Sequence, residues 1–412
     1  MQYAFRRWRL LLRAGVGVSV AVLAVAVASA TGAPKRHPAP GGSPNIFSKP
    51  WGTVHNGVPV RLWTLESGHG MTVRITNYGG VVQSIYVPGR NRRVANVVLG
   101  FPRLSDYENL FEHQPWPAPG GSGNAYFGAI IGRYANRIAN ASFTLNGTTY
   151  HLPANNGPNT LHGGIKAYNA QVWSASEQRG KGFVALKLTY TDPDGYNGFP
   201  GAVSNTVTYR VTSDNALNIR YTATTTKPTV VNFTNHSYFN LAGEGSGDIY
   251  GQILQINSNT FTPIDANLIP TGFDSVAGTP FDFRRPKPIG RDIRNAFMRD
   301  GHQLVIAHGY DHNWVIKGKG LRLAAVARDP VSGRVLRTYT TEPGLQVYTS
   351  NFLVGDLVGT SGRTYRQGAA FTLETQHYPD SPHHIGDPLW PSVVLNPGQT
   401  FNSTTIFKFG VG

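Results

Sequence analysis

The sequence predicts an all-β protein, folded as one large antiparallel β-sandwich. The 412 residues include 48 glycines and 28 prolines, only 14% of them are charged, and long segments with helical periodicity are scarce. Short runs of alternating apolar residues recur from Trp51 onward, with turn residues between them. Many strands with few helices predict stacked antiparallel sheets. No change of composition divides the chain, so a single domain is the simpler interpretation.

The predicted strands are justified by their period-two alternation and by the turn residues that bound them. In chain order they span 58–65, 71–77, 81–87, 184–190, 202–211, 217–225, 321–328, 335–340 and 345–349. The segments 143–146 and 149–152 flank Asn146-Gly147, a dipeptide typical of a tight hairpin turn with positive φ. The region 112–124 (EHQPWPAPGGSGN) holds too much Pro and Gly for regular structure, which predicts a loop.

The first fifty residues read as a leader. Four arginines between residues 6 and 13 precede an apolar run, 14–28, and Ala28-Ser29-Ala30 offers small residues for cleavage. This layout predicts a signal peptide over 1–30 and hence export, periplasmic or extracellular. The alternative is an uncleaved membrane anchor, although the apolar run is short for a span. Arg6-Arg7 faintly resembles a twin-arginine signal. Residues 31–50 are rich in Pro and Gly and predict a disordered leader before a catalytic domain over 51–412.

Charge and cysteine content exclude several classes of partner. The formal net charge of +15 becomes +11 if the four leader arginines are removed (15 − 4). The basic residues are scattered, and no recognition helix or RNA-binding sheet pattern accompanies them, so we expect no nucleic-acid partner. The chain has no cysteine, which excludes disulfides and thiolate zinc sites.

Two polar segments are candidates for a functional site. In NFTNHSYFNL (232–241), His236 stands among aromatic and amide side chains, a setting suited to a general acid. A hydrogen-bonded core histidine would give the same pattern. In GAIIGRYANRIA (128–139), Arg133 and Arg137 lie four apart in an apolar stretch. Either one could bind a substrate oxygen, and either could be an ion-paired structural arginine.

Three further residues carry chemistry in unusual settings. His162 is followed by two glycines, as in a ligand loop or a plain tight turn. Asp311 stands beside His312 and Trp314, where it could accept a sugar hydroxyl or cap an Asx-turn. Glu374 lies inside a strand-like segment, where a carboxylate is costly and is usually paired or catalytic.

Other charged and histidine residues favour structural roles. We interpret Asp265, Asp282 and Arg284 as turn caps or paired charges. The three histidines near the end of the chain lack regular ligand spacing and lie in a Pro-rich context, which argues against a metal site: His377, His383 and His384.

Taken together, several segments resemble the aldose 1-epimerase (galactose mutarotase) family. They occur in the family's order and cover nearly all of the chain after the leader: GRYANRI (132–138), NNGPNTLHGG (155–164), NHSYFNL (235–241), DANLIPTG (265–272) with GTPFDFR (278–284), GYDHN (309–313), LQVYTSNFL (345–353) and LETQHYPDSP (373–382). The resemblance implies the galactose mutarotase-like supersandwich, a large antiparallel β-sandwich.

The resemblance also implies an isomerase that interconverts the α and β anomers of a free aldohexose, glucose or galactose, without cofactor or metal. His236 falls on the family's catalytic acid and Glu374 on its base. The sugar-binding positions fall on Asn136, Arg137, His162, Tyr238, Asp311 and Gln346, and the choice of Arg137 over Arg133 rests on the resemblance alone. The sequence departs from the family in a longer 112–124 loop, which could cover the cleft, and in a 165–172 stretch without the usual Phe-Asp pair.

Three alternatives stay open at this point. A non-catalytic carbohydrate-binding sandwich would not need Glu374 with His236. A glycoside hydrolase would use two carboxylates, with Asp311 as the second. A family relative acting on another sugar derivative, such as a phosphorylated one, is the nearest alternative enzyme. The oligomeric state is not predicted.

Overall fold

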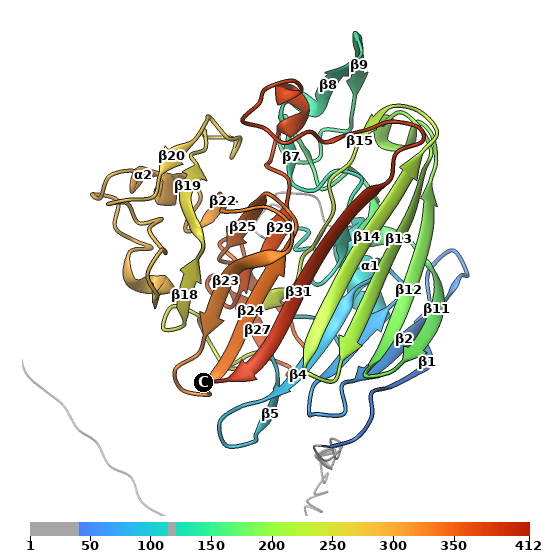
Figure 1. The fold of residues 1–412 in the computed structure, drawn as a ribbon, viewed down its shortest axis with the longest axis vertical. Coiled ribbons are helices and arrows are strands. Elements are labelled where there is room, and N and C mark those ends of the chain that lie inside the picture. The colour runs from blue at the N-terminus through green and yellow to red at the C-terminus, as the bar shows by residue number, and fades with distance from the viewer. Residues whose placement is uncertain (1–40, 114–120) are drawn as a thin grey trace, which may run out of the picture. The chain divides into compact units, whose positions relative to one another are not determined.

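Antiparallel strands dominate the computed structural model, which describes residues 41–113 and 121–412 (Figure 1). The described residues belong to one compact unit. Every pairing between its named strands is antiparallel, which confirms the predicted fold class. The predicted signal peptide lies outside the described residues. Within the described residues, no helix is long and apolar enough to cross a membrane.

The largest layer is a nine-stranded sheet that runs diagonally across Figure 1. Its strands, in spatial order, are β11 (Ser174–Gly180), β12 (Phe183–Asp192), β13 (Val203–Thr212), β14 (Ala216–Thr225), β31 (Phe401–Val411), β24 (Arg334–Thr340), β23 (Arg322–Arg328), β18 (Ile253–Ile256) and β21 (Lys287–Pro288). The C-terminal strand β31 is inserted between β14 and β24, so it joins the two halves of the sheet.

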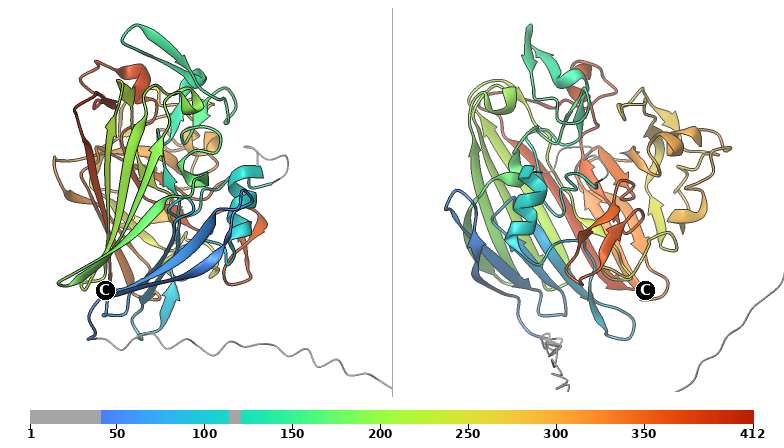
Figure 2. Two further views of the ribbon diagram at one scale, coloured as in Figure 1. Left: turned by 90° about the vertical axis from the view of Figure 1, so that its right-hand side faces the viewer. Right: turned by 180° about the vertical axis from the view of Figure 1, so that it is seen from behind.

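An N-terminal five-stranded sheet packs against one face of this layer, as the left view of Figure 2 shows. It consists of β1 (Asn45–Thr53), β2 (Pro59–Glu66), β3 (Thr72–Thr76), β4 (Val82–Pro88) and β5 (Val94–Asn96). Leu65 and Ile85 of this sheet share one buried core with Leu188 and Ile219 of the large sheet. Face-to-face burial of apolar residues from two sheets is the defining feature of a β-sandwich.

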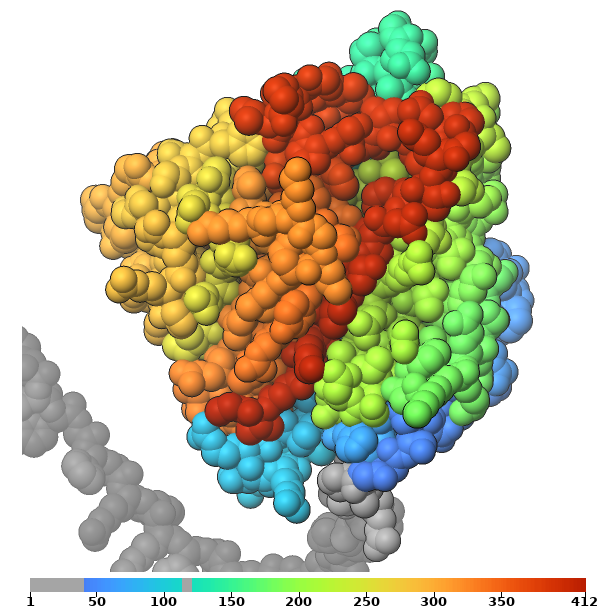
Figure 3. Space-filling model, in the orientation of Figure 1, coloured from blue at the N-terminus to red at the C-terminus, as the bar shows by residue number. Residues whose placement is uncertain are grey.

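The strands of the large sheet alternate between buried and more exposed side chains, as a sheet with one solvated face requires. In β13 the burial pattern alternates residue by residue along most of the strand. In Figure 3 these strands themselves form much of the surface that faces the viewer. This alternation is the sequence signal that predicted them.

A second five-stranded sheet carries much of the polar chemistry. Its order is β20 (Asp274–Ser275), β19 (Ser258–Thr262), β22 (Asp311–Ile316), β25 (Gly344–Tyr348) and β29 (Glu374–Gln376). Strands β25 and β29 are buried at every position. Because they are covered on both faces, polar residues of these strands must find partners within the protein or serve a ligand.

In the part of the chain that the structure describes, short two-stranded ladders, two α-helices and five short 3₁₀ helices complete the fold. The ladders are β6 (Ile130–Ile131) with β16 (Thr234–Asn235), β7 (Arg137–Ile138) with β10 (Thr160–Leu161), β8 (Ser142–Leu145) with β9 (Thr148–His151), β15 (Thr229–Val230) with β30 (Val394–Leu395), β17 (Tyr238–Phe239) with β28 (Phe371–Thr372), and β26 (Val354–Val358) with β27 (Thr364–Arg366). The α-helices are α1 (Leu104–His113) and α2 (His302–Ile306). Asn146 and Gly147 both have positive φ, which confirms the predicted hairpin turn.

Two predicted boundaries are wrong. The leader does not extend to residue 50, because β1 begins at Asn45 and pairs with β2. The loop does not begin at Glu112, because α1 continues through His113. This helix was missed because it is short, and its apolar residues (Leu104, Tyr107, Leu110, Phe111) pack in a satellite core that a strand-rich interpretation does not anticipate. Residues 114–120 of the predicted loop lie outside the described residues.

Candidate active site

A single pocket collects most of the predicted site residues. It is lined by Ser122, Asn124, Ala125, Tyr126, Asn136, Arg137, Leu161, His162, His236, Tyr238, Asp311, Tyr348, Phe352, Leu353 and Glu374. Some of these residues lie in strands of the second five-stranded sheet or of the short ladders, and the others, His236 and His162 among them, lie in the segments that follow such strands or connect them. Seven of the eight residues predicted for the site therefore meet in one pocket. The eighth, Gln346, contacts it indirectly.

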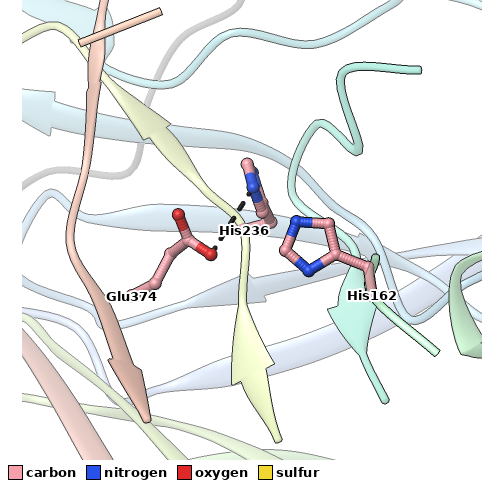
Figure 4. A group of neighbouring side chains, drawn as sticks. All are labelled: His162, His236 and Glu374. Atoms are coloured by element: carbon pink, nitrogen blue, oxygen red, sulfur yellow. Dashed lines mark ion pairs between the residues drawn. The ribbon is translucent and has the colours of Figure 1, made fainter. Parts of the chain in front are cut away.

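His236 and Glu374 face each other across this pocket (Figure 4). The Nε2 atom of His236 lies 3.5 Å from Oε2 of Glu374, and both side chains are buried. The other carboxylate oxygen of Glu374 accepts a hydrogen bond of 2.9 Å from the Thr372 hydroxyl. Oε2 has no hydrogen-bond partner within the protein. An acid–base pair is thus held with one oxygen fixed and the other directed at the imidazole.

The backbone around His236 is fixed by a ladder to the segment that begins at Gly128. The His236 amide donates to Ala129 and its carbonyl accepts from Gly128. The Asn235 side-chain amide donates to the Gly128 carbonyl at 2.9 Å. The Ser237 hydroxyl donates to Asn235 in turn. The polar residues around the histidine in the sequence therefore position its backbone.

Asp311 and Arg137 form the charged side of the pocket. An Arg137 Nη2 atom lies 3.8 Å from Asp311 Oδ2, while Arg137 Nε donates to Asn156 at 2.9 Å. Gln346 Nε2 donates to Asp311 Oδ1 at 2.7 Å. Gln346 thus orients the carboxylate from behind the pocket. The Asx-turn alternative for Asp311 is not observed among its hydrogen bonds.

His162 is locked as a hydrogen-bond donor. Its Nδ1 atom accepts the backbone N–H of Asn136 at 3.1 Å. Because Nδ1 is the acceptor, the neutral ring must carry its hydrogen on Nε2. Both His162 and Asn136 have positive φ, a strained conformation that clusters at functional sites. The next residue, Gly163, has to be a glycine, because a Cβ there would lie 2.3 Å from the Gly132 carbonyl oxygen.

Burial controls the proton affinities in the pocket. Burial, aided by the negative charge of Asp311 and opposed by the Thr372 hydrogen bond and Arg137, raises the pKa of Glu374 to about 8. Burial lowers the pKa of His236 to about 3. The pKa of Asp311 is raised by its burial, and that of His162 is lowered by its burial. Near neutral pH the His236–Glu374 pair therefore holds one proton, and burial favours the arrangement without separated charges.

The same three side chains could in principle hold a metal ion. Single ligand atoms of His162, His236 and Glu374 lie within 4.8 Å of one another, and two histidines with a carboxylate are a zinc ligand set. A metal-bound histidine donates a hydrogen bond from its other ring nitrogen. His162 Nδ1 instead accepts one, so its Nε2 keeps a hydrogen and cannot bind a metal. The donor set does not fit a metal ion.

The remaining predicted candidates lie outside the pocket. Arg133 is fully buried and its Nε donates to Asp192 at 2.7 Å, so it is the structural arginine of the two. Asp282 pairs with Arg284, and Asp265 accepts two backbone N–H groups in its own turn, which confirms their structural roles. The terminal histidines have separate partners: Glu342 for His377, Asp380 for His383 and the Trp390 ring for His384.

Aromatic residues complete the pocket, and the sequence did not single them out. The Tyr126 ring meets His162 edge-on at a centroid distance of 4.7 Å. Tyr348 and Phe352 line the same pocket and stack at 6.0 Å. Nothing in the sequence distinguishes these side chains from core aromatics. Ser122 and Asn124, at the end of the predicted 112–124 loop, also line the pocket, so that end of the loop reaches the cleft.

A buried carboxyl–imidazole pair in a pocket lined by aromatic and polar side chains is the arrangement expected of an enzyme that works by proton transfer. The model of the family described as "Aldose 1-epimerase" matches residues 61–408. The chain therefore belongs to the aldose 1-epimerase family.

Relatives in sequence and structure agree with this assignment. Galactose mutarotase from Rattus norvegicus is 39% identical over 343 residues, covering 83% of this chain and 92% of the relative. Aldose 1-epimerase from Escherichia coli is 37% identical over 359 residues, covering 86% and 96%. The crystal structure of galactose 1-epimerase from Lactobacillus acidophilus superposes with a TM-score of 0.76 at 27% identity, covering 90% of this chain and all of the other.

Proposed function

We propose that this chain, an isomerase of the aldose 1-epimerase family, interconverts the α and β anomers of a free aldohexose such as galactose or glucose. The observation that carries the proposal is the His236–Glu374 pair, 3.5 Å apart and open to the pocket. Mutarotation needs a base for the proton of the anomeric hydroxyl and an acid for the ring oxygen. Both oxygens are bonded to the same carbon, so the two groups that serve them must lie close together.

In the forward step, Glu374 takes the proton from the O1 hydroxyl while His236 gives its Nε2 proton to the ring oxygen O5. The C1–O5 bond breaks and C1 becomes an aldehyde carbonyl. Rotation about C1–C2 presents the other face of this carbonyl to the O5 hydroxyl. On reclosure O5 attacks C1, His236 takes the O5 proton, and Glu374 returns its proton to O1. At the end of the cycle Glu374 is again a carboxylate and His236 is again an imidazolium.

This assignment requires Glu374 as carboxylate and His236 as imidazolium, whereas burial in the free pocket favours the uncharged arrangement. A bound sugar supplies what the charged arrangement needs. The O1 hydroxyl donates to the carboxylate, and the ring oxygen accepts from the imidazolium, so each charge gains a hydrogen bond. We infer that substrate binding moves the shared proton onto His236.

The charge of the pocket supports a neutral sugar as substrate. Among its lining residues, Arg137 is the one Lys or Arg, and it faces the two carboxyl groups of Asp311 and Glu374. A phosphorylated sugar would place more negative charge beside these carboxyl groups. His162 Nε2–H and Arg137 would donate to sugar oxygens, and Asp311 would accept from hydroxyls. Asn136 and Tyr238 line the pocket within reach of the same ligand.

Polarimetry tests the proposal against its alternatives. Purified protein should accelerate the approach of freshly dissolved α-D-glucose or α-D-galactose to the same final rotation. A glycoside hydrolase would instead release reducing sugar from a glycoside, and a binding module would change neither reading. Saturable binding of sugar without acceleration would refute the proposed reaction.

We also propose that the N-terminal leader directs export. The arginines before an apolar run and the Ala28-Ser29-Ala30 sequence support a cleaved signal peptide. The enzyme would then equilibrate anomers of free sugar outside the cytoplasm. N-terminal sequencing of the protein recovered from its native host tests this, because a start near residue 31 is expected and a start at Met1 would contradict it.

A further inference from the structure

A row of amide side chains lies beside Glu374 on the same face of the second five-stranded sheet. Asn313 on β22 stands opposite Gln346 on β25, and Gln346 stands opposite Glu374 on β29. Gln376 lies two residues beyond Glu374, opposite Gly344. Residues directly opposite in an antiparallel sheet, and residues two apart in a strand, point to the same face. The four polar side chains therefore project into one region.

Most of the polar atoms in this row lack a partner. Asn313 and Gln376 are completely buried, and for each the side-chain oxygen and the side-chain nitrogen have no hydrogen-bond partner in the protein. The same is true of Gln346 Oε1 and of Glu374 Oε2. Gln346 uses its nitrogen on Asp311, and Glu374 uses its other oxygen on Thr372. Six unpaired polar atoms thus come from three adjacent strands.

Gly344 provides room within this row. A Cβ on Gly344 would lie 2.3 Å from Asn313 Oδ1. Gly344 lies in a strand and is not among the residues with positive φ, so its backbone conformation is open to any residue. Glycine is therefore needed at this position to leave space for the Asn313 side chain, and not to allow an unusual backbone conformation.

Unpaired buried amides are expensive, since each costs about 1–3 kcal/mol when it loses water without gaining a partner. Proteins meet this cost with ordered internal water, which makes two to four hydrogen bonds to such groups. We propose that Asn313 and Gln376 bind ordered water beside Glu374 and act as positioning residues for its carboxylate. This inference rests on the proposed function, because the role it gives to the water is to support the charged form of the base.

The consequence for catalysis follows from the surroundings of Glu374. The titratable or charged groups that face it are His236, Asp311 and Arg137, with His162 and the hydroxyls of Tyr126, Tyr238 and Tyr348 in the same pocket. Water held by the two amides adds hydrogen-bond donors for the carboxylate from the neighbouring part of the same sheet face. These donors stabilise the carboxylate that must accept the O1 proton, and they lower the cost of moving the shared proton onto His236.

The test compares Asn313→Leu and Gln376→Leu with wild type by polarimetry across pH. Each variant should lower kcat about 10-fold, the loss expected when a charged group loses one buried hydrogen bond. The alkaline fall of kcat/KM should move up by about one pH unit, because a carboxyl group with fewer donors holds its proton longer. Gln376→Asn keeps the amide group, so it should recover part of the lost kcat and move the alkaline fall of kcat/KM part of the way back.

Two matched controls separate solvation of Glu374 from general damage. Tyr221→Phe removes a buried hydroxyl without a partner from β14 of the nine-stranded sheet and should leave the pH profile in place. Gly344→Ala should act like the amide variants, whereas Gly410→Ala should not. Gly410 also lies in a strand, and its added Cβ would be 3.7 Å from the nearest atom.

Infrared titration of the protonated Glu374 carbonyl, identified by its loss in Glu374→Gln, gives a readout that does not depend on turnover. The band should persist to higher pH in the leucine variants. Folded leucine variants with unchanged infrared titration and unchanged pH profiles would overturn the inference. Failure of the proposed function is distinguishable, since wild-type protein would then show no acceleration of mutarotation at all.

Discussion

His236 Nε2 and Glu374 Oε2 are separated by 3.5 Å, although the two residues lie 138 positions apart in the chain (374 − 236), His236 between β16 and β17 and Glu374 in β29. This separation exceeds a normal hydrogen bond, so the two groups are neighbours without being bonded to each other. In glycoside hydrolases the paired carboxyl groups stand about 5 Å or more apart, because they flank a glycosidic bond. A closer pair suits a reaction at two oxygens on one carbon.

Replacing either member of this pair should abolish most of the activity. Glu374→Gln keeps the size and the Thr372 hydrogen bond but cannot take a proton, and His236→Asn cannot give one. We expect kcat to fall by roughly 10² to 10⁴, the range for loss of a general acid or base. The double variant should be little worse than either single one, because the two groups act as a unit. A single variant with wild-type turnover would show that the roles are wrongly assigned.

The pH dependence of kcat/KM should reflect one proton shared by the pair. The active form carries that proton, and it is lost as pH rises through the raised pKa of Glu374, about 8. The lowered pKa of His236 means that a second proton binds only in strong acid. Catalysis should therefore be flat from about pH 5 to 7 and fall above about 8. A profile that instead rises through pH 8 would indicate a base without a coupled acid.

The buried carboxyl group should also make stability depend on pH. The pKa of Glu374 is higher in the folded protein than its ordinary value of 4.5, so between these values the folded state binds a proton that the unfolded state does not. The resulting stabilisation is complete below pH 4.5 and is lost as pH rises through about 8. Glu374→Gln has no carboxyl group to titrate, so its stability does not fall in this way. Its free energy of unfolding, relative to that of wild type, should therefore increase by a few kcal/mol between pH 5 and 9, at about 1.4 kcal/mol per unit of pKa.

Urea unfolding at both pH values measures this difference. Asp248→Asn, at an exposed carboxylate, serves as the control and should show no such trend. A difference between Glu374→Gln and wild type that stays constant with pH would mean that the carboxyl group titrates normally in the folded protein.

Chelation should leave the enzyme active. The hydrogen bond from the Asn136 amide to His162 Nδ1 keeps a hydrogen on Nε2, where a metal would have to bind. Dialysis against EDTA should therefore not change the rate of mutarotation, and added Zn²⁺ should not restore or raise it. Loss of activity on dialysis, recovered with metal, would show that His162 adopts the other tautomer.

Strands of the nine-stranded sheet were predictable because one face of that sheet is solvated, which produces the alternation seen in β13 and β14. Glu374 was predictable as a functional residue because a carboxylate in a buried strand is costly. Tyr126 was not predictable, since its position depends on a positive φ in a segment without regular structure. The role of Gln346 also depends on strand register, because it reaches the pocket only through Asp311.

The arginine pair shows where local sequence stops being informative. Arg133 and Arg137 are four apart in one apolar segment, a spacing that would place them together on a helix. The segment is not helical, and Asn136 turns the backbone with a φ of +66° just before β7. The two guanidinium groups consequently have different surroundings. Only resemblance to the family selected Arg137, and the pocket contains that residue and not Arg133.

These surroundings predict opposite effects for two identical substitutions. In Arg133 each nitrogen donates to a protein oxygen: Nε to Asp192, Nη1 to the Pro200 carbonyl and Nη2 to the Pro193 carbonyl. Arg133→Met leaves the buried Asp192 without its charged partner, although the Tyr168 hydroxyl still donates to it, and should destabilise the protein by about 3–5 kcal/mol. The KM of the protein that remains folded should change little, because no part of Arg133 lines the pocket.

Arg137→Met should act on catalysis more than on folding. Only Nε of Arg137 is committed to a hydrogen bond, with Asn156, so its remaining N–H groups can serve a sugar in the pocket. Asp311 keeps its hydrogen bond from Gln346, so the loss of stability should be smaller than for Arg133→Met. We expect kcat/KM to fall by about 10-fold or more, as when a charged group loses its hydrogen bond. Urea unfolding measures the loss of stability in both variants, and polarimetry measures the loss of kcat/KM. If one variant were the more impaired in both assays, this division of roles would be refuted.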